Sequence, residues 1–309
     1  MQLDFFRKFI ILIHRTLTKF IIRCNEVAVD NRCSASFFIP GRKSRRCGGL
    51  RIFMRNERIN RLAEIPGKIS FLYENLVTGE KASYRENEPL MAASVIKLFV
   101  MAAAFQRIEE GRLDPEEMFH VKKSDHVPSC GALTYLHDGI GVNAMDLVTL
   151  MIIFSDNTAA NFLIDLLGLE EINGTIRKLG FEQTVLQRKM YDLEKSKKGI
   201  QNYITVGETG RLLKMMYQGS LISRQASERM ISILKNQQLC SKIPFYLQAL
   251  PEEPEIAHKT GEDVGITHDV GIVYGKEPFL VCFCGNETDT PAFERIIAEV
   301  SLELYNEIN

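Results

Sequence analysis

The sequence predicts an α/β (α+β) fold: a sheet built from strands at both ends of the chain, helices on its two faces, and an inserted all-helical subdomain. Strand patterns occur over residues 68–84 and again over 255–284, whereas helical periodicity dominates the interval between them. The chain has 309 residues, of which 45% are hydrophobic. This length supports the core of one large domain, and the composition excludes collagen, coiled coil and a wholly disordered chain.

The first strands form a predicted β-hairpin. Residues 68–73 and 81–84 read Lys-Ile-Ser-Phe-Leu-Tyr and Lys-Ala-Ser-Tyr, which suits strands. Thr78 and Gly79 lie between the two segments, and glycine is typical of a turn that reverses the chain. We therefore expect the two segments to pair in the sheet.

The middle of the chain carries most of the helical signal. Apolar residues recur there at intervals of three and four, and Gly111, Gly168 and Gly180 each end a predicted helix. The helical lobe should extend over about residues 92–240. The predicted helices cover residues 92–110, 143–154, 157–167, 170–179, 205–217 and 224–237. Residues 181–202 are polar and have no clear period, which indicates a long functional loop.

The last part of the chain returns to strands and closes with a helix. Residues 255–274 and 279–284 are predicted strands, with turns at Gly261-Glu-Asp and at Gly275-Lys. Residues 292–308 have the apolar spacing of an amphipathic helix. These strands and the N-terminal hairpin would complete one sheet.

Residues 1–53 differ in charge from the rest of the chain. They hold eleven Lys and Arg against three acidic residues, a net charge of +8, whereas residues 54–309 carry −9. We predict a basic leader over 1–53, either disordered or translated from a mis-assigned start, and a folded domain over 54–309 that begins near Met54. A membrane-surface helix over residues 5–23 is the alternative for the leader.

Several classes of site and partner are disfavoured. The apolar run 9–13 is too short for an export signal, and no run reaches the roughly 18 to 20 apolar residues of a spanning helix, so localisation stays unknown. The acidic domain would repel nucleic acid. Seven cysteines without a CxxC pair and six histidines without ligand spacing predict no metal, and we expect no cofactor and a monomer with reduced cysteines.

A serine and a lysine are placed for nucleophilic chemistry at the start of a predicted helix. Ser94-Val-Ile-Lys97 has a spacing of three, which puts the amine and the hydroxyl on the same helical face. A buried amine of lowered pKa can take the proton of such a hydroxyl. The motif alone is weak, because Ser232-Ile-Leu-Lys235 also matches inside a predicted helix.

Two further motifs follow in a fixed order. Ser155-Asp-Asn157 precedes a predicted helix, and Lys259-Thr-Gly261 lies on a predicted strand. Taken alone, the first is a good helix cap and the second an ordinary strand end. The order S-x-x-K, S-D-N, K-T-G is that of class A β-lactamases and penicillin-binding proteins.

Over residues 65–308 the chain therefore resembles the class A β-lactamase-like serine hydrolases. The resemblance implies an antiparallel sheet, a helical subdomain, and a site between them. It implies that Ser94 is the acylated nucleophile, Lys97 the general base, Ser155 a proton relay, and Lys259 a cation that keeps Lys97 poised. Asp156 would be structural.

The same resemblance assigns the substrate-binding residues. Asn157 would hold the side-chain amide of the substrate, and Lys259 with Thr260 and Gly261 would form the strand that binds its carboxylate. The backbone N–H groups of Ser94 and Glu262 would form the oxyanion hole.

One position departs from the family pattern. The family carries a glutamate that activates the deacylating water two residues after an arginine of the long loop, but two residues after Arg188 this chain has Met190. Asp192 or Glu194 could supply the carboxylate only along a different loop path. Otherwise the acyl-enzyme should persist.

The resemblance leaves three functions open. The first is β-lactamase activity, the hydrolysis of a β-lactam antibiotic. The others are a penicillin-binding peptidase or esterase, with a peptidoglycan-like substrate, and a non-enzymatic β-lactam sensor that acylates without turnover.

Overall fold

The computed structural model describes residues 57–309. The predicted basic leader over 1–53 and the predicted domain start near Met54 lie outside the described residues. The four cysteines of the described part, Cys130, Cys240, Cys282 and Cys284, are free. Within residues 57–309 no helix is long and apolar enough to cross a membrane.

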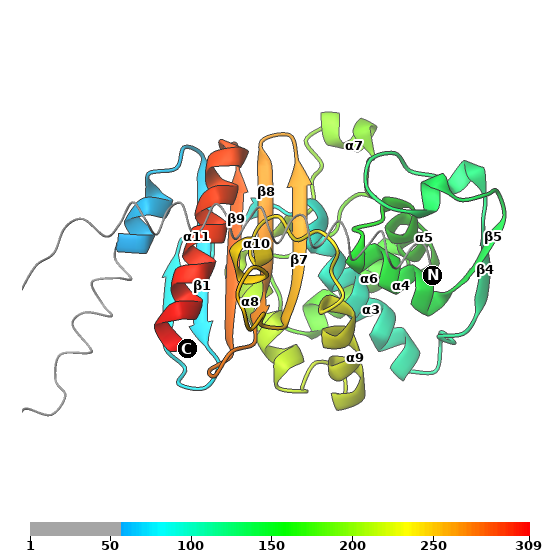
Figure 1. Cartoon of the computed structure of the whole chain (residues 1–309). Coiled ribbons are helices and arrows are strands. Elements are labelled where there is room, and N and C mark those ends of the chain that lie inside the picture. The colour runs from blue at the N-terminus through cyan, green and yellow to red at the C-terminus, as the bar shows by residue number, and fades with distance from the viewer. Residues whose placement is uncertain (1–56) are drawn as a thin grey trace, which may run out of the picture.

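One five-stranded sheet joins the two ends of the domain, in the order β2-β1-β9-β8-β7 (Figure 1). Each strand is antiparallel to its neighbours. The strands are β1 (Lys68–Asn75), β2 (Lys81–Tyr84), β7 (Ile256–Asp263), β8 (Ile266–Val273) and β9 (Phe279–Asn286). The predicted sheet of N- and C-terminal strands is confirmed.

Alternate residues of the strands face two separate cores. On β1, Phe71 packs with helices α10 (Pro244–Leu247) and α11 (Thr290–Ile308), whereas the next residue, Leu72, faces the opposite core. The rings of Phe71 and Phe283 lie 5.1 Å apart in the first of these cores. Helix α8 (Val206–Tyr217) covers the other face. This two-residue alternation explains why the central strands are hydrophobic on both sides.

The inserted lobe lies beside the β7 edge of the sheet (Figure 1). Its central helix is α3, whose residues from Lys97 to Phe105 are all buried. An apolar run of this length therefore forms a core helix. The lobe's helices are α3 (Lys97–Glu109), α4 (Ala144–Ile153), α5 (Asn157–Leu167), α6 (Leu169–Lys178), α7 (Leu193–Lys197) and α9 (Arg224–Leu234), with short 3₁₀ turns η1 (Ala93–Ile96), η2 (Lys123–Asp125) and η3 (Leu133–Tyr135).

The sequence predicts an all-helical lobe, but the lobe also contains two pairs of short strands. Strands β3 (Leu90–Met91) and β6 (Tyr203–Ile204) pair with each other, as do β4 (Met118–Val121) and β5 (Ile140–Asn143). These strands have two to four residues, too few to show a period in the sequence.

The predicted turn at Gly261-Glu-Asp was wrong, because the β7–β8 turn falls at Val264-Gly265. Gly265 has φ of +68°, the left-handed conformation that such a turn requires. Gly261 instead continues β7, where its missing side chain serves a close approach to η1.

The ring of Phe283 should contribute strongly to stability because it is wholly buried in the centre of the sheet. Phe283→Ala removes the ring and leaves a cavity, so we expect it to lower the free energy of unfolding by about 3–5 kcal/mol. Urea unfolding measures the change. Val264→Ala is the matched control, since Val264 is 96% exposed and should change stability by less than about 0.5 kcal/mol. A loss below about 1 kcal/mol for Phe283→Ala would contradict this packing.

Candidate active site

Ser94 and Lys97 lie where the chain enters the central helix. Ser94 is half-buried in η1, and Lys97 is the first residue of α3. The preceding residue, Ala93, has φ of +41°, which is rare for a residue with a side chain. Such backbone strain is often found at functional sites. The structure thus keeps the two residues one turn apart, at the N-terminal end of a buried helix.

The amine of Lys97 is buried and has only neutral hydrogen-bond acceptors. Its Nζ donates to the backbone oxygen of Ser155 at 2.7 Å, to Ser155 Oγ at 3.2 Å and to Asn157 Oδ1 at 2.8 Å. Burial lowers the pKa of Lys97 to about 7, although the charges of Cys130 and Asp156 oppose this shift. An amine with this pKa can accept a proton near neutral pH.

Ser155 lies in the short link between α4 and α5. Its φ is +52°, again left-handed, and its side chain is buried. The next residue, Asp156, caps α5 by accepting the N–H of Ala159 at 3.0 Å. The sequence interpretation of S-D-N as a helix cap therefore holds for Asp156, while Ser155 and Asn157 face Lys97.

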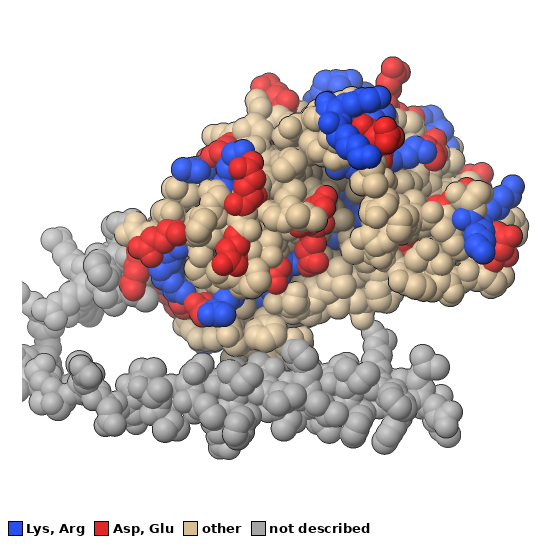
Figure 2. Space-filling view, turned by 90° about the horizontal axis from the view of Figure 1, so that it is seen from above, with Lys and Arg blue, Asp and Glu red and all other residues tan. Residues whose placement is uncertain are grey.

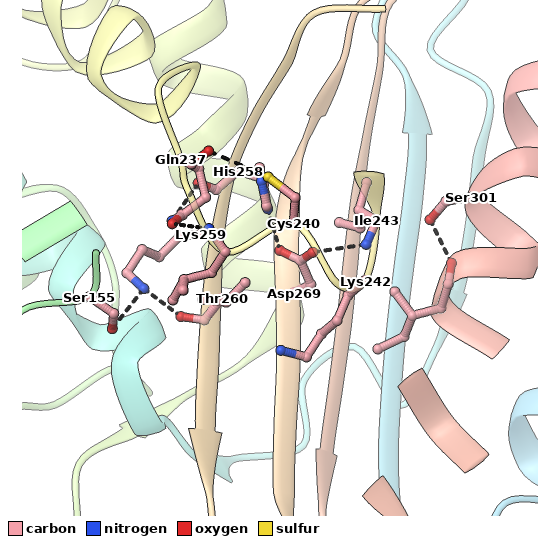
Figure 3. Close-up of polar contacts among 12 residues, drawn as sticks. Ser155, Gln237, Cys240, Lys242, Ile243, His258, Lys259, Thr260, Asp269 and Ser301 are labelled. Atoms are coloured by element: carbon pink, nitrogen blue, oxygen red, sulfur yellow. Dashed lines mark hydrogen bonds and ion pairs between the residues drawn. The ribbon is translucent and has the colours of Figure 1, made fainter. Parts of the chain in front are cut away.

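Strand β7 brings a second buried amine to the same hydroxyl. Lys259 Nζ donates to Ser155 Oγ at 3.1 Å and to the backbone oxygen of Thr260 at 2.6 Å (Figure 3). Burial lowers the pKa of Lys259 well below its usual value, and the nearby charge of Lys97 lowers it further. Ser155 Oγ thus lies between two amines that compete for protons.

The absence of a side chain at Gly261 lets β7 approach the start of the helix. A Cβ atom at Gly261 would lie 3.3 Å from the backbone nitrogen of Ser94 and 3.1 Å from Val95 Cγ2. The next residue, Glu262, is half-exposed and forms an ion pair with the buried amine of Lys242. This ion pair ties the end of β7 to the segment that precedes α10.

The loop opposite β7 is tied to the same cluster, which the sequence motifs did not reveal. Asp156 Oδ2 accepts the N–H groups of Ala132 and Leu133 at 2.7 and 2.8 Å. A Cβ atom at Gly131 would lie 2.3 Å from Asp156 Cγ, so only glycine fits there. The Gly-Ala-Leu run after Cys130 is the sequence signal that could have indicated this contact.

Comparison with known proteins identifies the family. Residues 54–308 match the family model described as the beta-lactamase enzyme family. The chain belongs to this β-lactamase family. The protein is 24% identical to β-lactamase BRO-1 of Moraxella catarrhalis over 249 residues, which are 74% of this chain and 75% of the relative. It therefore has a hydrolase fold of the class A type.

Solved structures show the same fold. A β-lactamase from Sphaerobacter thermophilus aligns with a TM-score of 0.74 and 27% identity, over 82% of this chain and 96% of that one. A PBP-A variant, solved as an acyl-enzyme complex with penicillin G, aligns with a TM-score of 0.73 and 25% identity, over 82% and 96%.

The long loop of this β-lactamase family member is fixed to the site by amides. Asn161 Oδ1 accepts the N–H of Met190 at 2.7 Å, and Asn161 Nδ2 donates to its backbone oxygen at 2.9 Å. At the base of the loop, Asn202 hydrogen-bonds the backbone of Arg188, whose guanidinium donates to Gln201. Met190, buried and apolar, thus occupies the loop position tied to α5.

The two loop carboxylates have other partners. Asp192 Oδ1 caps α7 by accepting the N–H of Lys195 at 3.0 Å. The side chain of Glu194 is 79% exposed and lies 3.5 Å from Lys197. In the view onto this end of the molecule, blue side chains surround a red one near the position of α7 (Figure 2). Neither carboxylate is hydrogen-bonded or ion-paired to Lys97 or Ser155, so their role as a base stays a prediction.

Within residues 57–309 no group of three or more His, Cys, Asp or Glu side chains is placed to hold a metal ion. The expectation of no metal and no cofactor stays a prediction for the chain.

The buried amine of Lys97 should make folding stability depend on pH. Its pKa is about 7 in the folded protein and 10.5 without the fold, so between these values the unfolded chain binds more protons. Stability should therefore rise with pH across this window. Lys97→Met removes this contribution, and we expect a slope that is smaller by about 1 kcal/mol per pH unit. Urea unfolding at several pH values measures it, and equal slopes would contradict the assignment.

Proposed function

We propose that the protein is a serine hydrolase that opens β-lactams through an acyl-enzyme on Ser94. One observation carries the proposal: Ser155 Oγ lies 3.2 Å from Lys97 Nζ and 3.1 Å from Lys259 Nζ, beside the turn that holds Ser94. This arrangement joins a base, a relay hydroxyl and a second cation in one buried chain of hydrogen bonds. The family membership supports the same chemistry.

The first step forms the ester. Substrate carboxylate beside Lys259 and Thr260 favours the ammonium form of Lys259, so Lys97 stays neutral and takes the proton of Ser94 Oγ. The oxygen attacks the β-lactam carbonyl, and the N–H groups of Ser94 and Glu262 bind the developing oxyanion. Collapse breaks the ring C–N bond, and the proton passes from Lys97 through Ser155 to the departing nitrogen. Asn157 would hold the substrate's side-chain amide.

The second step, hydrolysis of the ester, has no base at the usual loop position. Met190 stands there, and losing a positioned general base costs about 10²- to 10⁴-fold in rate. A persistent acyl-enzyme is therefore the expected outcome, so binding of penicillin outlasts its hydrolysis. This observation favours a second candidate, a penicillin-binding peptidase, esterase or sensor, and the likeness to PBP-A supports it. Asp192 or Glu194 would act as the base only if the loop moved.

Penicillin should form one covalent adduct, and it should be on Ser94. We expect the mass of the full chain to rise by that of one penicillin G, and peptide mapping to place the adduct on Ser94. Ser94→Ala should form none, whereas Ser232→Ala, which alters the second S-x-x-K match, should react normally. An adduct on Ser94→Ala, or none on the unaltered chain, would contradict the proposal.

A carboxylate in place of Met190 should speed hydrolysis of the ester. We expect Met190→Glu to raise the deacylation rate by about 10²- to 10⁴-fold, because it restores a base beside the site. Loss of the adduct mass with time and turnover of a chromogenic cephalosporin measure it. Met190→Gln is the matched control, since it has the same shape without a base.

Equal deacylation by the Met190→Glu and Met190→Gln variants would show that Met190 does not stand at the base position. Fast turnover by the unaltered chain that is lost in Asp192→Asn or Glu194→Gln would instead assign a relocated base.

A further inference from the structure

Two aspartates are the only fully buried acids among residues 57–309, and each accompanies one site amine. Asp156 raises the pKa of Lys97, and Asp269 raises that of Lys259, in both cases against the larger effect of burial. Neither aspartate is hydrogen-bonded to its lysine. Asp156 is already part of the S-D-N motif, whereas no motif and no step of the proposed mechanism accounts for Asp269.

Asp269 lies on β8 in a site built to hold an anion. Its Oδ1 lies 2.9 Å from His258 Nδ1, and its Oδ2 accepts the N–H of Ile243 at 3.0 Å. The side chains of His258 and Asp269 are 2% and 0% exposed. When Asp269 is ionised it can only accept hydrogen bonds, and Nδ1 of His258 is then the donor.

Neighbouring residues leave room for the pair. Gly271 lies opposite His258 in the β7–β8 register, and a Cβ atom there would lie 2.5 Å from the Cβ of His258. Thr260 lies opposite Asp269 in the same register. The pair therefore ties β7, the strand that carries Lys259 and Thr260, to β8 through side chains.

The amine of Lys259 and the carboxylate of Asp269 lie on opposite sides of β7 (Figure 3). The other titratable groups near Asp269 supply little competing negative charge. Burial raises the pKa of Cys240 to about 11 and that of Cys282 further, so both thiols stay neutral. Lys242 is a cation already paired with Glu262, and it opposes the positive charge of Lys259.

We propose that Asp269, held by His258, is a positioning residue that supplies a buried negative charge beside Lys259 and so favours the ammonium form of that amine. This role rests on the proposed function for its catalytic meaning, since a protonated Lys259 is the cation that would bind the substrate carboxylate. Charges in a protein interior are weakly screened, so a carboxylate across one strand is effective without contact.

The first test needs no turnover. Lysine labelled with ¹³C at Cε reports the protonation of each amine by NMR, and Lys259→Arg assigns the Lys259 signal. Asp269→Asn keeps the shape and removes the charge. We expect the titration midpoint of Lys259 to fall by about one pH unit, a tenfold loss of proton affinity.

Two further variants separate charge from folding. Asp263→Asn is the matched control, because Asp263 is exposed at the end of β7, the strand that carries Lys259. Its loss should change the titration midpoint of Lys259 only slightly. His258→Asn keeps a donor for Asp269 and should resemble the unaltered chain, whereas His258→Phe removes the donor and should lower the Lys259 midpoint. An unchanged midpoint in a folded Asp269→Asn variant would overturn the proposal.

The second test uses acylation by penicillin G. Because Lys259 would lose its proton at lower pH, we expect the alkaline limb of the acylation rate of Asp269→Asn to move to lower pH by about one unit. A lower acylation rate whose alkaline limb stays at the same pH would show that Asp269 has a merely structural role. If the unaltered chain forms no adduct, the proposed function fails, while the NMR midpoint still decides the role of Asp269.

Discussion

The site depends on two buried amines that share one hydroxyl. Ser155 Oγ accepts from Lys97 and from Lys259, and both amines are fully removed from water. Burying two like charges side by side is unfavourable, so the pair holds its protons less tightly than free lysines do. Removal from water lowers the pKa of Lys97, one helical turn from Ser94, to about 7, and the charge of Lys97 lowers the pKa of Lys259 further. The fold can be understood as the frame that keeps these groups together.

Three parts of that frame come from distant segments of the chain. Helix α3 supplies Lys97, the α4–α5 link supplies Ser155, and β7 supplies Lys259. The left-handed backbone of Ala93 and Ser155 and the missing side chain of Gly261 allow these segments to meet. The charge of Asp269 on the neighbouring strand β8 would then favour the ammonium form of Lys259. Strain at these points is tolerated because the surrounding core is large and closely packed.

The sequence predicted the sheet and the main helices, because long amphipathic periods are local signals. Its ordered motifs also named Lys97, Ser155 and Lys259, whose side chains the structure brings together. It did not predict the two-residue strands β3 and β6, which form only through tertiary pairing. It also missed Asp269, since nothing next to this residue shows that His258 lies across the strand pair. The sequence also could not place Asp192 and Glu194, because the loop that carries them has no helical or strand periodicity from which its path could be predicted.

The pH dependence of acylation tests the central claim most directly. If neutral Lys97 takes the proton of Ser94, the rate of adduct formation with penicillin G should rise with pH and level off above about 7, the pKa of Lys97. The Lys97→Met variant should not form the adduct, so the rise of the rate with pH should be absent as well. A rate that stays flat through pH 7, or acylation that persists in Lys97→Met, would contradict the account.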